Sequence, residues 1–106
     1  MVAFDPTIGA EIRKTRPAVV VSSDGVGRLP VKLVAPVTEW KDAFIDSVWL
    51  VRIDSDSQNG LTKLSAVDVL QLRGMDTRRF VSRLGRVSDE RMDEITSAIA
   101  IVVEHS

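Results

Sequence analysis

The sequence predicts a mainly β (α+β) protein, a small antiparallel barrel with one C-terminal α-helix. Three observations predict this fold. Four apolar segments rich in Val, Ile and Leu have the length of strands, and Gly, Pro, Asp and Ser residues bound them. The connections between these segments are too short for crossover helices, which favours antiparallel pairing. The last segment instead repeats its apolar residues at helical spacing.

The strands are expected in a simple order along the chain, at residues 17–23, 31–37, 47–53 and 65–73. The residues "VAF" at 2–4 are expected to end a further strand, and "DPTIGAEIRKT" at 5–15 to form a long hairpin loop before Pro17. A short turn of helix is expected near residues 76–80. These short, closely connected strands are typical of a barrel.

The C-terminal segment "SDERMDEITSAIAIVVEH" predicts a helix with a defined beginning. Ser88 can cap it, and Asp89 and Glu90 suit the positive end of the helix dipole. The apolar residues of one helical face would pack on the sheet, and they are Met92, Ile95, Ile99 and Val102.

Composition indicates one domain over residues 1–106, with 44% hydrophobic and 27% charged residues. The absence of cysteine excludes disulfides, thiolate metal sites and a cysteine nucleophile. A formal net charge of −1 argues against a protein that coats nucleic acid broadly, but it allows a local basic site. Neither a signal peptide nor an apolar run of about 20 residues is present, so we expect a cytoplasmic protein without a membrane segment.

The stretch "EIRKTRPAVVV" places three basic residues directly before an apolar strand. Pro17 disfavours the helical conformation for Arg16 and itself suits the first position of a strand. Arg16 should therefore be better fixed than Arg13 and Lys14, which lie farther out in the loop. A fixed, planar guanidinium is well suited to a phosphate group. From these residues alone, a solvated loop cluster is the simpler interpretation.

Three blocks of the chain carry a resemblance to a known family: "FDPTIGAEIRKTRPAVVVSSD", "KLVAPVT" and "LSAVDVLQLRGMDTRRFVSRLGRVSDERMDEITSAI". Together they resemble the MazF/PemK family of type II toxin endoribonucleases over nearly the whole chain. The resemblance implies an SH3-like barrel of the CcdB/MazF type with a C-terminal helix. It also implies a homodimer that cleaves single-stranded RNA such as mRNA without a metal, and that a cognate antitoxin protein silences. Unlike family members with a Gly-Asp-aromatic signature before "VAFDP", this chain begins directly with Met1, so its first strand is expected to be shortened or its start misassigned.

The resemblance implies that Arg16 and Thr38 are the catalytic residues. Arg16 would stabilise charge on the phosphorane, and Thr38 would orient the phosphate. Without the resemblance, Thr38 is more simply a strand-terminal threonine with a local backbone bond. The residues expected to bind RNA or to border its site are Glu11, Arg13, Lys14, Trp40, Gln71 and Arg73.

Aromatic and basic residues near these positions leave alternatives open. Trp40 can stack on an unpaired base, whereas Phe44 is expected to pack beneath the loop or at the dimer seam. Trp49 is expected in the core or at an interface. Arg78 and Arg79 either contact phosphates or belong to a solvated turn.

No cofactor or metal is expected, because the sequence contains no ligand cluster and its single histidine, His105, lies in the terminal tail. Single-stranded RNA, an antitoxin protein and a second copy of the chain are the expected partners. A gyrase-binding, non-catalytic toxin of the CcdB type on the same fold is the alternative function. A catalytically silent RNA- or antitoxin-binding module is a third.

Overall fold

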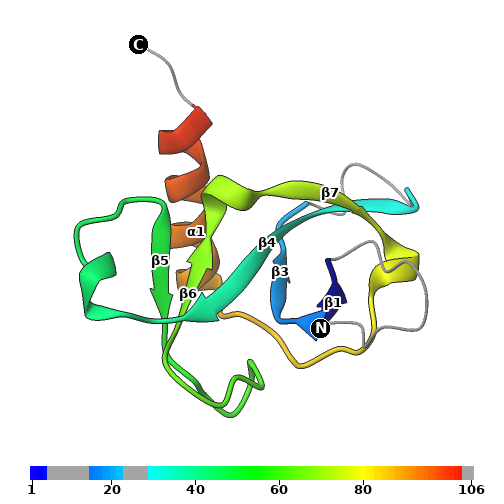
Figure 1. The fold of residues 1–106 in the computed structure, drawn as a ribbon, viewed down its shortest axis with the longest axis horizontal. Coiled ribbons are helices and arrows are strands. Elements are labelled where there is room, and N and C mark those ends of the chain that lie inside the picture. Colours follow the sequence, from blue (N-terminus) through cyan, green and yellow to red (C-terminus); the bar gives the residue numbers. More distant parts are fainter. Residues whose placement is uncertain (5–14, 23–28, 104–106) are drawn as a thin grey trace.

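A five-stranded antiparallel sheet forms the centre of the molecule (Figure 1). The computed structural model describes residues 1–4, 15–22 and 29–103. The strand order is β3-β4-β6-β5, and β7 pairs with the first part of β4. The bounds are β3 Ala18–Val20, β4 Val31–Glu39, β5 Leu50–Ile53, β6 Ser65–Asp68 and β7 Arg73–Asp76. The predicted antiparallel, mainly β fold is therefore confirmed.

Two further strands close the sheet into a barrel. Strand β1, Val2–Ala3, pairs with β2, Thr15–Arg16, and β2 continues through Pro17 into β3. On its other side β1 meets the segment that follows β7: Val2 bridges Phe80, and the Val81 amide donates to the Met1 carbonyl oxygen at 2.9 Å. Thr15 and Arg16, expected at the end of a loop, thus belong to a short strand.

The predicted strand at 65–73 is wrong as a single element, because a 3-10 turn, η3 (Val69–Gln71), divides it into β6 and β7. The Asp68 carboxylate accepts a hydrogen bond from the Leu70 amide at 3.1 Å, which stabilises this turn. The predicted strand at 47–53 is also shorter, since residues 47–49 form a turn after η2 (Asp42–Phe44).

Helix α1 spans Asp89–Val103, as the apolar spacing predicted. The Ser88 side-chain oxygen accepts a hydrogen bond from the Arg91 amide at 3.3 Å, so the predicted cap is confirmed. A 3-10 helix, η4 (Thr77–Arg79), confirms the expected turn near 76–80. Within the described residues, the helices are too short or too polar to cross a membrane.

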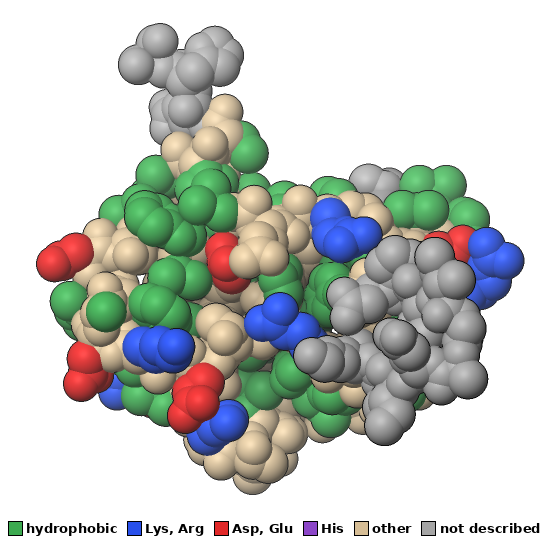
Figure 2. Space-filling view, viewed as in Figure 1, with side chains coloured by type: hydrophobic (Ala, Val, Ile, Leu, Met, Phe, Trp, Pro, Cys, Tyr) green, Lys and Arg blue, Asp and Glu red, His purple; other side chains and the backbone are tan. Residues whose placement is uncertain are grey.

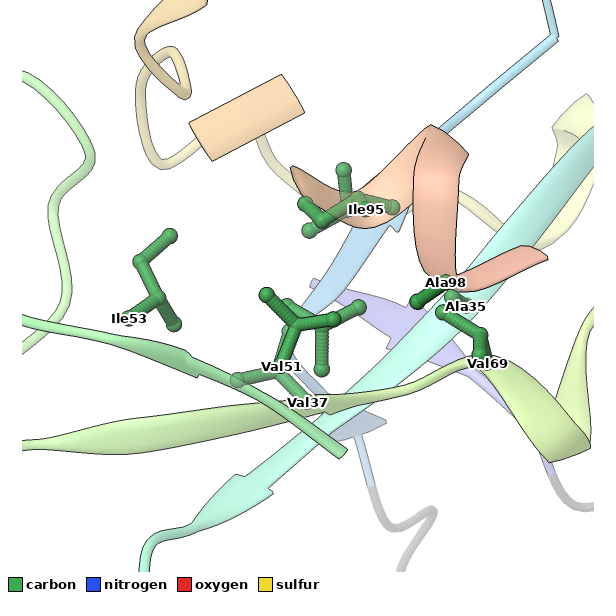
Figure 3. Packing of buried hydrophobic residues seen from close by; sticks show 9 residues of the cluster. Ala35, Val37, Val51, Ile53, Val69, Ile95 and Ala98 are labelled. Carbon is green, nitrogen blue, oxygen red and sulfur yellow. The ribbon is translucent and has the colours of Figure 1, made fainter. Parts of the chain in front are cut away.

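Strand β4 separates two groups of buried side chains. Ala35 and Val37 point to the side of α1, where they meet Ile95 and Ala98 of the helix (Figure 3). Val34 points to the other side, where it packs with Val2 and Met75. This alternation is the period of a β-strand, and it places every second residue of β4 on the side away from the helix.

Replacement of Ile95 by alanine tests the dependence of the fold on the helix contact. Ile95 is fully buried in the core, so Ile95→Ala should lower the free energy of unfolding by about 2–5 kcal/mol. Ile101 lies on the same helix with 54% of its surface exposed, and Ile101→Ala should cost less than about 1 kcal/mol. Urea unfolding followed by far-UV circular dichroism measures both values, and equal costs would contradict the packing described.

Candidate functional site

Arg16 and Thr38 lie at the point where β2 and β3 meet β4. Ala18 pairs with Pro36, and the Val37 amide donates to the Pro17 carbonyl oxygen at 2.9 Å. Extending this register two residues beyond the Ala18–Pro36 pair sets Arg16 opposite Thr38, in the type of antiparallel pair whose Cβ atoms are about 5 Å apart. Arg16 is exposed and Thr38 is half-buried. A planar cation and a hydroxyl are thus presented together at the surface.

Both side chains belong to the face of the sheet that α1 does not cover. Val37 and Val67 face the helix as part of the main core. Because side chains alternate along a strand, Thr38 and its cross-strand partner Ala66 point the other way. On β5, Arg52 pairs with Ala66 and therefore shares that face. The residues Arg16, Thr38, Ala66 and Arg52 form a row across four strands, which we call the strand row.

Trp40 follows Thr38 on the same face, and its amide donates to the Leu64 carbonyl oxygen at 3.0 Å. Its ring meets the Phe44 ring edge-on, with ring centroids 5.8 Å apart. The Arg52 guanidinium lies over the Trp40 ring, with its carbon 5.8 Å from the centroid. Phe44 thus packs against Trp40, in line with a packing role in the loop, and Trp40 adjoins the strand row.

Gln71 and Arg73 lie on either side of the break between β6 and β7. The Gln71 amide nitrogen donates to the Asp68 carboxylate at 2.7 Å. Arg73 is exposed and lies over the Phe4 ring at 5.9 Å, and it pairs with Val34 of β4. Gln71 is therefore in the 3-10 turn η3 and not in the strand that was predicted. Both positions belong to elements next to the strand row.

Three predicted RNA-binding residues, Glu11, Arg13 and Lys14, lie outside the described residues. Trp49 is 36% exposed in a turn, so it does not lie in the core, and its alternative place at an interface stays a prediction. Sequence inspection missed Arg52, because cross-strand register decides which residues share its row.

The basic residues of η4 are engaged within their own turn. Arg78 forms two side-chain hydrogen bonds to Asp76, at 3.1 and 3.0 Å. The side-chain hydrogen bond from Arg78 lowers the pKa of the Asp76 carboxyl below its usual value and raises the pKa of Arg78. Arg79 donates to the Ala3 carbonyl oxygen at 3.4 Å. These contacts support the turn interpretation of Arg78 and Arg79.

The surface near the site is not uniformly basic. Figure 2 shows Lys and Arg side chains scattered singly among hydrophobic and acidic ones. A hollow of about 810 Å³ opens between β3 and the segment 80–87, and Pro17 and Val37 line it. Among the described residues, no three His, Asp or Glu side chains are grouped closely enough to hold a metal ion. The arrangement at Arg16 and Thr38 can bind a phosphate by charge and hydrogen bonds.

Comparison with known proteins identifies the family. The family described as "PemK-like, MazF-like toxin of type II toxin-antitoxin system" matches residues 1–103. The chain belongs to this toxin family. It is 30% identical to "Endoribonuclease EndoA" of Bacillus subtilis (strain 168) over 102 residues, covering 92% of this chain and 84% of that protein.

Solved structures of MazF toxins have the same fold as this PemK/MazF family member. The MazF structure from Deinococcus radiodurans (Form-I) superposes with a TM-score of 0.69 at 22% identity, covering 96% of this chain and 88% of that one. "Mycobacterium tuberculosis toxin MazF-mt6" superposes with a TM-score of 0.68 at 21% identity, covering 81% and 83%. These comparisons do not favour the CcdB-type alternative.

Replacement of Asp68 tests how the PemK/MazF-like chain holds Gln71. Asp68→Ala removes both the cap of η3 and the bond to Gln71, and should lower the free energy of unfolding by about 0.5–2 kcal/mol. Gln71→Ala leaves the cap intact and should cost less than about 0.5 kcal/mol. Urea unfolding compares the two variants. If Gln71→Ala lowers the free energy of unfolding as much as Asp68→Ala does, Asp68 does not stabilise η3 by capping it.

Proposed function

We propose that this chain is a toxin endoribonuclease that cleaves single-stranded RNA at specific sequences without a metal ion. The observation that carries the proposal is the register of β3 and β4, which, when extended, sets Arg16 opposite Thr38 on the face of the sheet that α1 does not cover. The PemK/MazF family assignment and the similarity to a protein named Endoribonuclease EndoA support it. Cleavage of mRNA in the cytoplasm would inhibit translation and growth.

The proposed reaction is an internal transfer of the phosphodiester. The 2′-oxygen attacks phosphorus and loses its proton, while the bond from phosphorus to the 5′-oxygen breaks and that oxygen gains a proton. The products are a 2′,3′-cyclic phosphate and a 5′-hydroxyl, so atoms balance without added water. Arg16 would stabilise the negative charge of the phosphorane, and Thr38 would orient the phosphate by a hydrogen bond. Trp40, Gln71 and Arg73 would bind the flanking RNA.

Mutation of the two proposed catalytic residues tests the activity. Wild-type protein should cleave a long single-stranded RNA in excess chelator. Arg16→Ala and Thr38→Ala should each lower the rate by about 10²–10³, since each removes a preorganised contact. Arg91→Ala and Thr96→Ala on α1 are matched controls on the opposite side of the sheet, and should cleave normally. Chelator-sensitive activity restored by Mg²⁺, or wild-type cleavage by Arg16→Ala, would contradict the proposal.

The proposed partners are a second copy of the chain and an antitoxin protein. A crystal structure titled MazE-MazF (Form-II) from Deinococcus radiodurans superposes with a TM-score of 0.69 at 22% identity over 96% of this chain and 87% of that one. That similarity supports a comparable partner here. A basic site that accepts RNA also suits an acidic segment that folds on binding.

Inhibition is therefore expected to occur by occlusion of the RNA site. Light scattering of the free protein should give about twice 11.7 kDa. A saturating antitoxin peptide should abolish binding of a labelled single-stranded RNA, because both occupy the same face. A ternary complex that retains both ligands at full affinity would refute the shared site.

A further inference from the structure

The strand row continues beyond the proposed catalytic pair to a second arginine. Thr38 pairs with Ala66 on β6, and Ala66 pairs in turn with Arg52 on β5. Neighbouring strands are about 4.8 Å apart, so the backbones at Thr38 and Arg52 are separated by roughly 10 Å. Arg16 and Arg52 therefore flank Thr38 on opposite sides along one line. This line runs across the strands, on the face of the sheet that α1 does not cover.

The position between Thr38 and Arg52 is filled by a small side chain. Ala66 has no exposed surface, so neighbouring side chains cover its methyl group and it does not project between Thr38 and Arg52. A larger side chain at this position would stand between the two polar groups. An extended ligand that contacts both ends of the row would therefore pass over this covered position without touching Ala66 itself.

Aromatic packing holds the Arg52 guanidinium while leaving its hydrogen-bond donors accessible. Its carbon lies 5.8 Å from the Trp40 ring centroid, and Trp40 is itself fixed by the edge-on contact with Phe44. The ion pair to Asp54 is long, 3.8 Å, and both side chains are more than half exposed, at 55% and 64%. Such an exposed pair is weak, so it does not neutralise the arginine effectively. Arg78, with two short bonds to Asp76, is a clear contrast.

We propose that Arg52 is a second phosphate-binding residue, which contacts the RNA backbone beside the phosphate held at Arg16 and Thr38. The proposal rests on the proposed function, because it assumes that RNA crosses the strand row. An arginine is always charged, and its planar fork matches two phosphate oxygens. Holding the guanidinium over Trp40 reduces the conformational entropy lost when the phosphate binds. Trp40 is then a positioning residue for Arg52.

Salt-dependent binding of an uncleavable strand tests the proposal. The probe is a mixed-sequence single-stranded RNA with 2′-O-methyl groups, which blocks the attacking oxygen. Each phosphate contact contributes about 0.7 to the slope of log affinity against log salt for single strands. Arg52→Gln should therefore reduce the magnitude of the slope by about 0.7, while Arg52→Lys, which keeps the charge, should preserve it. Arg91→Gln on α1 removes the same charge from the other side of the sheet and should leave the slope unchanged.

The outcomes separate this proposal from the proposed function. If Arg52→Gln and wild type share one slope, Arg52 does not bind a phosphate. If the slope is unchanged but unmodified RNA is cut at different sequences, Arg52 contacts a base, which also overturns the proposal. If the wild-type protein fails to cleave unmodified RNA in chelator, the proposed function is refuted. The salt-dependence slopes of wild type and Arg52→Gln would still show whether Arg52 binds a phosphate. Arg52→Met provides a second neutral variant, with unfolding in urea as the control for folding.

Discussion

The register of β4 is the constraint on which both the core and the candidate site depend. Its alternate side chains serve opposite faces, with Val37 in the core under α1 and Thr38 on the open face. A slip of one residue would exchange these roles, burying the threonine and exposing the valine. The same register pairs Thr38 with Ala66 on one edge and, when extended beyond the Ala18–Pro36 pair, sets it opposite Arg16 on the other. Packing of the core therefore fixes the geometry of the polar face.

A proline lies at the point where β4 changes its pairing partner from β7 to β6. Val34 is the last β4 residue to pair with β7, and Val37 is the first to pair with β6. Pro36 falls in the gap between them, so its missing N–H removes no hydrogen bond from either ladder. On the opposite edge, the Val37 amide donates to the Pro17 carbonyl oxygen, which needs no N–H from Pro17. The turn η3 separates β6 from β7, and Pro36 lies in β4 opposite that break. Neither Pro36 nor Pro17 therefore removes a hydrogen bond between the strands.

The sequence predicted the elements that depend on neighbouring residues in the chain. It missed features that depend on how distant strands pair with one another. The Ser88 cap and the helical spacing around Ile95 are local, and both are confirmed. The division of residues 65–73 follows from the Asp68 bond to the Leu70 amide, which competes with a strand that apolar composition alone favours. Arg16 and Thr38 came from the family resemblance, and the structure brings their strands together. Arg52 was missed because two separate strand registers are needed to align it with Thr38.

Four arginines in the described part of the chain show two ways of engaging a guanidinium, and the difference bears on how a chain of net charge −1 can bind an anion. Arg78 and Arg91 have short bonds to Asp76 and Glu94, at 3.0 and 2.6 Å, so carboxylates occupy their donors. Arg52 and Arg73 lie over the rings of Trp40 and Phe4. A ring attracts the cation without accepting its edge hydrogen bonds, so the donors stay available for phosphate oxygens. Binding of an anion then depends on which arginines keep their hydrogen-bond donors available and not on total charge.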